Sequence, residues 1–238
     1  MLPLRDTIRA RHMPIVNWLI IVANGLVFLF ELSLGPGQWE AFIGRFGVVS
    51  QRFLNEGGPG QILTLFTSMF VHAGWFHLVS NVWALYIFGD NIEDRLGHLR
   101  YLLFYLIGGA TAGLAHIFVT RGGYAYVPTV GASGAISAVM GAYIVLFPRS
   151  RVVTLIPWVF FSVIEVPALL YIGIWFVSQL FNGLFALATA NAVWSYGGVA
   201  WWAHIGGFVA GALLVKVFER RRSQGQWPVE GYRPWSRR

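Results

Sequence analysis

Long stretches without a charged side chain constrain the fold of this chain more than any other feature. Asp, Glu, Lys and Arg are absent from 12–30, 57–89, 101–120, 122–148 and 166–215. A helix needs about 20 apolar residues to cross the hydrocarbon core of a bilayer. Charged residues make up only 11% of the chain, against about 25% in soluble domains. The sequence therefore predicts an integral membrane protein.

The last uncharged stretch is long enough for two spans, divided near Gly197-Gly198. We therefore expect an all-α membrane protein with six spans, at about 14–34, 70–89, 99–119, 131–148, 166–188 and 200–218. Together they form one membrane domain, 14–219, between an N-terminal segment, 1–13, and a basic tail, 220–238. The first apolar run is longer than that of a typical signal peptide, which favours an uncleaved first helix.

Positive charge is distributed unevenly about these spans. With six spans both termini lie on one side, and that side would hold 14 of the 17 Lys and Arg residues. The other side would hold Arg45, Arg52 and Arg121. Since cytoplasmic loops carry the excess of Lys and Arg, both termini are expected to be cytoplasmic. The cluster Arg220-Arg221-Arg222 then fits anionic lipid better than nucleic acid as a partner.

Two polar residues sit where spans begin. Ser133 belongs to Gly131-Ala132-Ser133-Gly134, which opens the span 131–148, and His204 lies near the start of the span 200–218. Such residues are costly in lipid unless they face a partner. Both spans run in the same direction, so the two side chains lie at a similar depth. A serine beside a histidine is a nucleophile beside its base, which indicates a hydrolase site within the membrane.

Small residues could bring these two spans together. They recur every four positions, at Gly134, Ala138 and Ala142 and at Ala203, Gly207 and Gly211. Alone, such stripes indicate only close helix packing. The start of the span 131–148 also offers unpaired N–H groups and the positive end of a helix dipole. An oxyanion formed by attack of Ser133 would lie beside these donors.

The second predicted span carries a further polar pair. His77 and Asn81 are four residues apart and share one helix face. The residues alone leave open whether this pair stabilises an anion or only satisfies polar groups of the helix. His72, near the start of the span, fits an interfacial residue that makes a structural hydrogen bond.

Taken in order, these motifs resemble the rhomboid family of intramembrane serine proteases. They are His72 with His77-x-x-x-Asn81, Gly131-x-Ser133-Gly134, and Ala203-His204-x-x-Gly207-x-x-x-Gly211. The segment 89–97 also looks like that family, and the resemblance covers about 14–219. It implies a rhomboid-like bundle of six helices, with Gly131, Gly134, Gly207 and Gly211 supporting the site.

The resemblance also implies roles for the polar residues. Ser133 would be the nucleophile and His204 its general base, in a dyad without aspartate. His77, Asn81 and the Ser133 backbone N–H would bind the oxyanion. The span 166–188 and the loop after it would form the gate and cap for a substrate helix. Substrates would be single-pass membrane proteins cleaved near the outer membrane boundary. The enzyme would need no metal or other cofactor.

The chain departs from the family pattern at two places. Many rhomboids have a Trp-Arg pair where this chain has Leu63-Thr64. Many also have an aromatic residue one turn after the serine, against the histidine ring, where this chain has Ser137. Neither departure removes a reacting group, so we expect an active enzyme.

Two other functions compete with the protease. A metal-binding transporter could use the histidines in or near spans, which are His72, His77, His116 and His204. Against it, the chain has no His-Glu-x-x-His motif. A non-catalytic rhomboid relative that binds substrates is the second alternative. For location, the six spans and short N-terminus favour a prokaryotic plasma membrane, while the oligomeric state and the substrate stay open.

Overall fold

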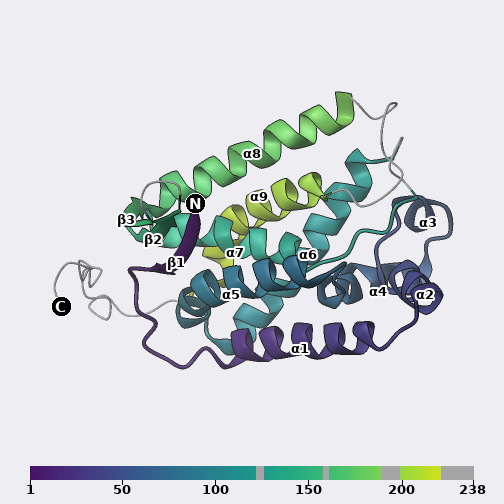
Figure 1. The fold of residues 1–238 in the computed structure, drawn as a ribbon, viewed down its shortest axis with the longest axis horizontal. Helices are drawn as coiled ribbons and strands as arrows, with labels where there is room; N and C mark the ends of the chain where they lie inside the picture. Colours follow the sequence, from purple (N-terminus) through teal and green to yellow (C-terminus); the bar gives the residue numbers. More distant parts are fainter. Residues whose placement is uncertain (122–125, 158–160, 189–198, 221–238) are drawn as a thin grey trace.

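Six long helices lie close to the six predicted spans in the computed structural model, which describes residues 1–121, 126–157, 161–188 and 199–220 (Figure 1). They are α1 (Ile15–Leu32), α5 (Trp75–Leu96), α6 (His98–Val119), α7 (Ser133–Leu146), α8 (Ala168–Ala188) and α9 (Trp201–Phe218). Much of the predicted basic tail and the Gly197-Gly198 pair lie outside the described residues.

Four of these helices, α1, α6, α8 and α9, are long and apolar enough to cross a membrane. A fifth span results if α5 is taken together with the segment 58–70, from which it is bent by 84°. The remaining helix, α7, has only 14 residues, but 134–143 are all buried. Because α7 lies in the centre of the bundle, its neighbours rather than lipid cover its sides (Figure 1). The described chain thus has four to five helices of spanning length.

Glycines let α7 and α9 approach until their backbones touch. A Cβ atom on Gly207 would collide with the carbonyl oxygen of Gly134, and one on Gly211 with that of Ala138. From the other side, a Cβ on Gly141 would collide with the carbonyl oxygen of Phe208. This close approach is what small residues at four-residue spacing permit in membrane helices.

A buried carboxylate ties α1 to α5 at the end where α1 begins. Glu93 accepts hydrogen bonds from the backbone N–H groups of Val16, at 2.9 Å, and Asn17, at 2.7 Å. These N–H groups have no partner within their own helix, and the dipole of α1 favours a negative charge there. Tyr101 of α6 then donates its hydroxyl to the Asn17 side chain at 2.8 Å. Glu93 and Asn17 together therefore join α1, α5 and α6.

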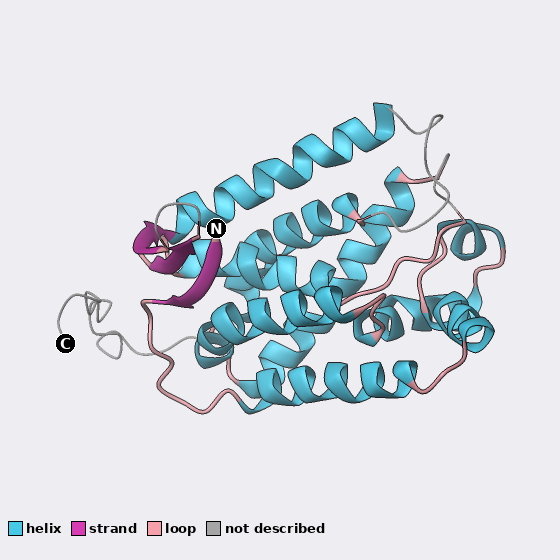
Figure 2. Ribbon diagram, in the orientation of Figure 1, coloured by secondary structure: helices cyan, strands magenta, loops and turns pink. Residues whose placement is uncertain are grey.

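The prediction of an all-α protein is wrong in one respect, because a small sheet lies at one end of the bundle (Figure 2). Its strands are β1 (Leu2–Asp6), β2 (Arg151–Ile156) and β3 (Ser162–Pro167), antiparallel in the order β1-β2-β3. The β2 and β3 sequences, RVVTLI and SVIEVP, are rich in the β-branched residues that favour strands. β3 also includes 166 and 167, which fall within the predicted span 166–188.

Short helices fill the segment between α1 and α5, at the opposite end of the bundle from the sheet (Figure 1). They are α2 (Pro36–Phe46), α3 (Ser50–Asn55), α4 (Gly58–Thr67) and the 3-10 turn η1 (Ser68–Phe70). The second predicted span, 70–89, is displaced, because α5 begins at Trp75 and continues to Leu96. The segment before α5 is extended at Val71 and irregular at Gly74 rather than helical.

Candidate active site between α5, α7, α8 and α9

Ser133 and His204 are in hydrogen-bonding contact. Ser133 is the first residue of α7, and His204 lies in the first turn of α9. The distance from Ser133 Oγ to His204 Nε2 is 2.7 Å. His204 is buried, with 9% of its surface exposed, and Ser133 is partly exposed. The contact between the α7 and α9 backbones therefore brings together the two residues that the sequence singled out.

The second ring nitrogen of His204 contacts a residue that the sequence analysis did not single out. His204 Nδ1 is 2.7 Å from Oε1 of Gln179, a buried residue in the middle of α8. The Gln179 amide nitrogen donates to the Trp175 carbonyl and to Ser178 Oγ. Its oxygen is thus left to accept a hydrogen bond from Nδ1–H, while Nε2 presents a lone pair to the Ser133 hydroxyl. A glutamine inside an uncharged span was the signal that could have revealed it.

Two tryptophans flank the His204 ring. The Trp175 ring of α8 lies with its centroid 5.8 Å away at an interplanar angle of 34°. The Trp201 ring of α9 approaches edge-on, at 6.3 Å and 90°. Ser137, where an aromatic residue was expected, instead donates its hydroxyl to the Ser133 carbonyl at 2.6 Å. The His204 ring therefore has aromatic contacts, but they come from α8 and α9 and not from α7.

His77 and Asn81 lie on α5, beside the backbone that leads into Ser133. A Cβ atom on Gly131 would come 2.5 Å from His77 Nε2 and 3.7 Å from Asn81 Nδ2. In the described structure, the Asn81 amide donates to the His77 carbonyl at 2.9 Å. The structure therefore brings the pair to the segment before the nucleophile, and not into hydrogen bonds with Ser133 itself.

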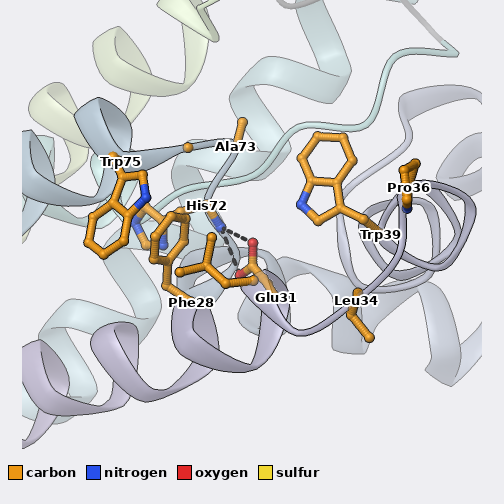
Figure 3. Close-up of a pocket in the computed structure, with 10 residues that line it drawn as sticks. Phe28, Glu31, Leu34, Pro36, Trp39, His72, Ala73 and Trp75 are labelled. Carbon is orange, nitrogen blue, oxygen red and sulfur yellow. Dashed lines mark hydrogen bonds between the residues drawn. The ribbon is translucent and has the colours of Figure 1, made fainter.

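His72 is fully buried next to this pair, with its ring centroid 5.1 Å from that of His77. Its backbone N–H donates to the Glu31 carboxylate, at 3.1 and 3.3 Å to the two oxygens. Both residues line a cavity of about 290 Å³ between α1, α2 and the start of α5, with Trp39 and Trp75 on its walls (Figure 3). His72 thus holds the end of α1 against the segment before α5.

A metal site gains no support from the part of the chain that the structure describes. Among those residues, no three His, Asp or Glu side chains gather as metal ligands would. His116 of α6, one of the histidines considered for a metal, lies 3.0 Å from the Thr129 hydroxyl through Nε2.

Comparison with known proteins identifies relatives over most of the chain. The model of the Rhomboid domain matches residues 59–221. RHOMBOID-like protein 1 of Arabidopsis thaliana is 32% identical over 165 residues, which are 69% of this chain and 36% of that protein. Rhomboid-like protein 11, chloroplastic, of the same plant is 30% identical over 203 residues, 83% of this chain and 66% of that protein.

A bacterial relative is the Rhomboid protease GluP of Bacillus subtilis, which is 32% identical over 139 residues, 58% of this chain and 26% of that protein. The chain therefore spans between about a quarter and two thirds of the length of these relatives.

The expectation of a prokaryotic plasma membrane is wrong. The relatives that match are mostly rhomboids of eukaryotic organelles: one is chloroplastic, and several others are mitochondrial. These relatives point to an organellar membrane instead. A short N-terminus and six predicted spans were too general to distinguish the two locations.

Proposed function

The chain belongs to the rhomboid family, and from that premise we propose that it is an intramembrane serine endopeptidase that uses Ser133 and His204. Rhomboid proteases act on transmembrane substrates within membranes. The observation that carries the proposal is the 2.7 Å contact between Ser133 Oγ and His204 Nε2 at the adjoining ends of two helices. A hydroxyl this close to an imidazole nitrogen can pass its proton to that nitrogen as it attacks a carbonyl.

The reaction follows from the two side chains. His204 takes the Ser133 proton while Oγ bonds to the carbonyl carbon of the scissile peptide. The resulting tetrahedral intermediate collapses when His204 gives that proton to the leaving amine, and an acyl-enzyme remains. Water, deprotonated by His204, then attacks the ester carbonyl, and the second product leaves as His204 returns the proton to Ser133 Oγ.

The negative oxygen of the tetrahedral intermediate needs donors. The first N–H groups of α7 have no partner within the helix, and the positive end of its dipole lies at Ser133. We assign the Ser133 backbone N–H, His77 and Asn81 to this oxyanion site. The Asn81 amide nitrogen carries two hydrogens, and because one of them donates to the His77 carbonyl, the other is left to donate to the substrate oxygen.

Substrates are proposed to be single-pass membrane proteins. A transmembrane helix hides its carbonyls in hydrogen bonds, so it must unwind before Ser133 can attack. Small or helix-weakening residues near the cleavage point make unwinding easier. If the chain has six spans, 14 of its 17 Lys and Arg residues lie on the side of both termini and 3 on the other, which supports a site that opens toward the side opposite the termini. α8 is the proposed gate, while the loop after it, expected to form the cap, lies outside the described residues.

Purified, detergent-solubilised protein tests the assignment with a model transmembrane substrate. Ser133→Ala and His204→Ala should each lower cleavage by about 10³-fold or more, because the nucleophile and base act as a unit. A fluorophosphonate should label the wild-type protein at Ser133 and leave both variants unlabelled. Ser137→Ala removes the serine one helical turn away and should keep labelling and cleavage.

Two outcomes would contradict the proposal. Equal cleavage by the wild type and Ser133→Ala would show that another residue carries the activity. A folded wild-type protein that binds transmembrane helices but is neither labelled nor active would support the non-catalytic alternative.

A further inference from the structure

We propose that Gln179 is a positioning residue for His204: its side-chain oxygen holds the imidazole in the tautomer that can act as a base toward Ser133. This inference rests on the proposed function, since it concerns how the same site is prepared for reaction. The contact that carries it is the 2.7 Å hydrogen bond between Gln179 Oε1 and His204 Nδ1.

The orientation of the Gln179 amide is fixed by its own partners. Its nitrogen is 3.2 Å from the Trp175 carbonyl and 3.1 Å from Ser178 Oγ. The Trp175 carbonyl can only accept a hydrogen bond. The Ser178 hydroxyl donates its one hydrogen to that carbonyl at 2.6 Å, so toward Gln179 it can only accept as well. Both positions therefore require the NH₂ group of Gln179 on that side. Its oxygen must face His204.

The oxygen in turn decides which nitrogen of His204 carries the proton. An amide oxygen opposite Nδ1 is satisfied only if Nδ1 bears hydrogen. Nε2 is then unprotonated and faces the Ser133 hydroxyl, as a general base requires. In the other tautomer, two lone pairs would face each other at Gln179, and Nε2–H would donate to Ser133 Oγ instead of accepting its proton. Both side chains are buried, with 5% and 9% exposed, so bulk water is a poor substitute partner for Nδ1.

The positioning residue belongs to a different structural unit from the dyad. Ser133 and His204 sit on the α7–α9 contact, whereas Gln179 lies on α8, which is at the edge of the bundle (Figure 1). In its most apolar window, α8 has 22% of residues buried, against 39% for α6 and α9. Gln179 is one of four buried residues on the inner face of α8, with Ala168, Ile172 and Gly183. The tautomer of His204 therefore depends on α8 being packed against α9.

NMR of the histidine ring nitrogens measures the tautomer of His204 directly. In detergent-solubilised protein with ¹⁵N-labelled histidine, the His204 signals are identified by their loss in His204→Ala. The wild type should show a protonated Nδ1 and an unprotonated Nε2. Gln179→Leu should move His204 toward a mixture of both tautomers. Asn182→Leu is the matched control, because the Asn182 amide donates to the Ser178 carbonyl one turn further along α8. It should leave the His204 signals unchanged.

Kinetics of the same variants give a second reading. Gln179→Leu should lower kcat for a model substrate by about 10- to 100-fold, as loss of a group that orients a functional histidine does, with little change in KM. Gln179→Glu keeps an acceptor oxygen and should restore most of kcat. Its carboxylate favours the protonated imidazole, so the acidic limb of its rate profile should move to higher pH.

The results separate this inference from the proposed function. If Gln179→Leu has the same kcat, the same pH–rate profile and the same His204 tautomer as the wild type, the positioning role is overturned. This holds even if Ser133 is confirmed as the nucleophile. An unlabelled Ser133 in the wild type would overturn the proposed function, while the NMR signals would still report the tautomer. If Gln179→Leu is less stable than the wild type, the Gln179→Glu variant decides the question. A folded Gln179→Glu protein whose kcat stays as low as that of Gln179→Leu counts against the positioning role of Gln179.

Discussion

At the scale of single residues, Gly131 couples the polar pair of α5 to the nucleophile. Its φ of +117° is one that L side chains rarely adopt, and its N–H donates to the Ser68 carbonyl at 2.8 Å. A side chain there would meet His77 Nε2. The backbone just before Ser133 can therefore pass beside α5 only as glycine.

Gly131→Ala should thus lower cleavage by at least tenfold and also lower the thermal midpoint. The added methyl group strains the backbone and pushes on His77, which is a proposed oxyanion donor. Gly57→Ala provides the control, because Gly57 also has a positive φ, +57°, but open space around its Cβ position. It should cost only the strain, about 1–3 kcal/mol. Equal losses of activity in the two variants would argue against a specific contact with His77.

The residues of the site differ in how well sequence could predict them. Ser133 and His204 were accessible because each follows a recognisable pattern and is costly in lipid without a partner. Gln179 and Trp175 were missed, because α8 carries no motif and its rotation about its axis is set only by packing against α9. The sequence led us to expect an aromatic residue at the position of Ser137, but the Trp175 ring that lies beside His204 comes from another helix.

At the scale of helices, the α7–α9 contact sets the separation of the proposed dyad. Gly207 and Gly211 lie against carbonyl oxygens of α7, so neither position has room for a methyl group. The sequence predicted this contact from four-residue spacing. It did not predict that α7 would be as short as 14 residues, since the length of a central helix is not governed by bilayer thickness.

Gly211→Ala should therefore lower the thermal midpoint and slow labelling of Ser133, because α9 must move away from the Ala138 carbonyl. Gly25→Ala, in α1, is the matched helical control, since no atom lies within 4 Å of its Cβ position. It should be neutral or stabilising by up to about 1 kcal/mol, owing to the better helix propensity of alanine. Thermal unfolding in detergent, with labelling rates at the same temperature, measures both. A destabilised Gly25→Ala with an unaffected Gly211→Ala would contradict this view of the contact.

At the scale of the whole molecule, one buried carboxyl group joins the sheet to the bundle. Asp6 of β1 accepts hydrogen bonds from the Tyr143 hydroxyl of α7, at 2.5 Å, and from the Asn91 amide of α5, at 2.8 Å. Burial raises the pKa of Asp6 from 3.8 to about 8, although the Tyr143 hydrogen bond opposes the shift. The sequence could not predict this junction, since β1 pairs with β2 about 150 positions later in the chain.

The free energy of unfolding should therefore depend on pH through Asp6. Because its pKa is higher in the folded state, the folded protein holds an extra proton between about pH 4 and pH 8. Stability should fall as the pH rises through this window and level off above it. Asp6→Asn keeps a polar side chain that cannot ionise, so it should flatten this dependence and raise the thermal midpoint near pH 8. Thermal midpoints of both proteins from pH 5 to pH 9 measure the difference, and parallel curves would contradict it.

The backbone contact between α7 and α9 also limits how the proposed substrate specificity of this protein could be altered. The contact has no room for even one added methyl group, because carbonyl oxygens of the backbone, rather than adaptable side chains, lie against the glycines. Most variants with substitutions at this helix contact are expected to be inactive. The exposed positions of α8, such as Leu170, Ile174 and Phe181, allow far more variation. New specificity should be sought on that helix, with Gln179 kept unchanged.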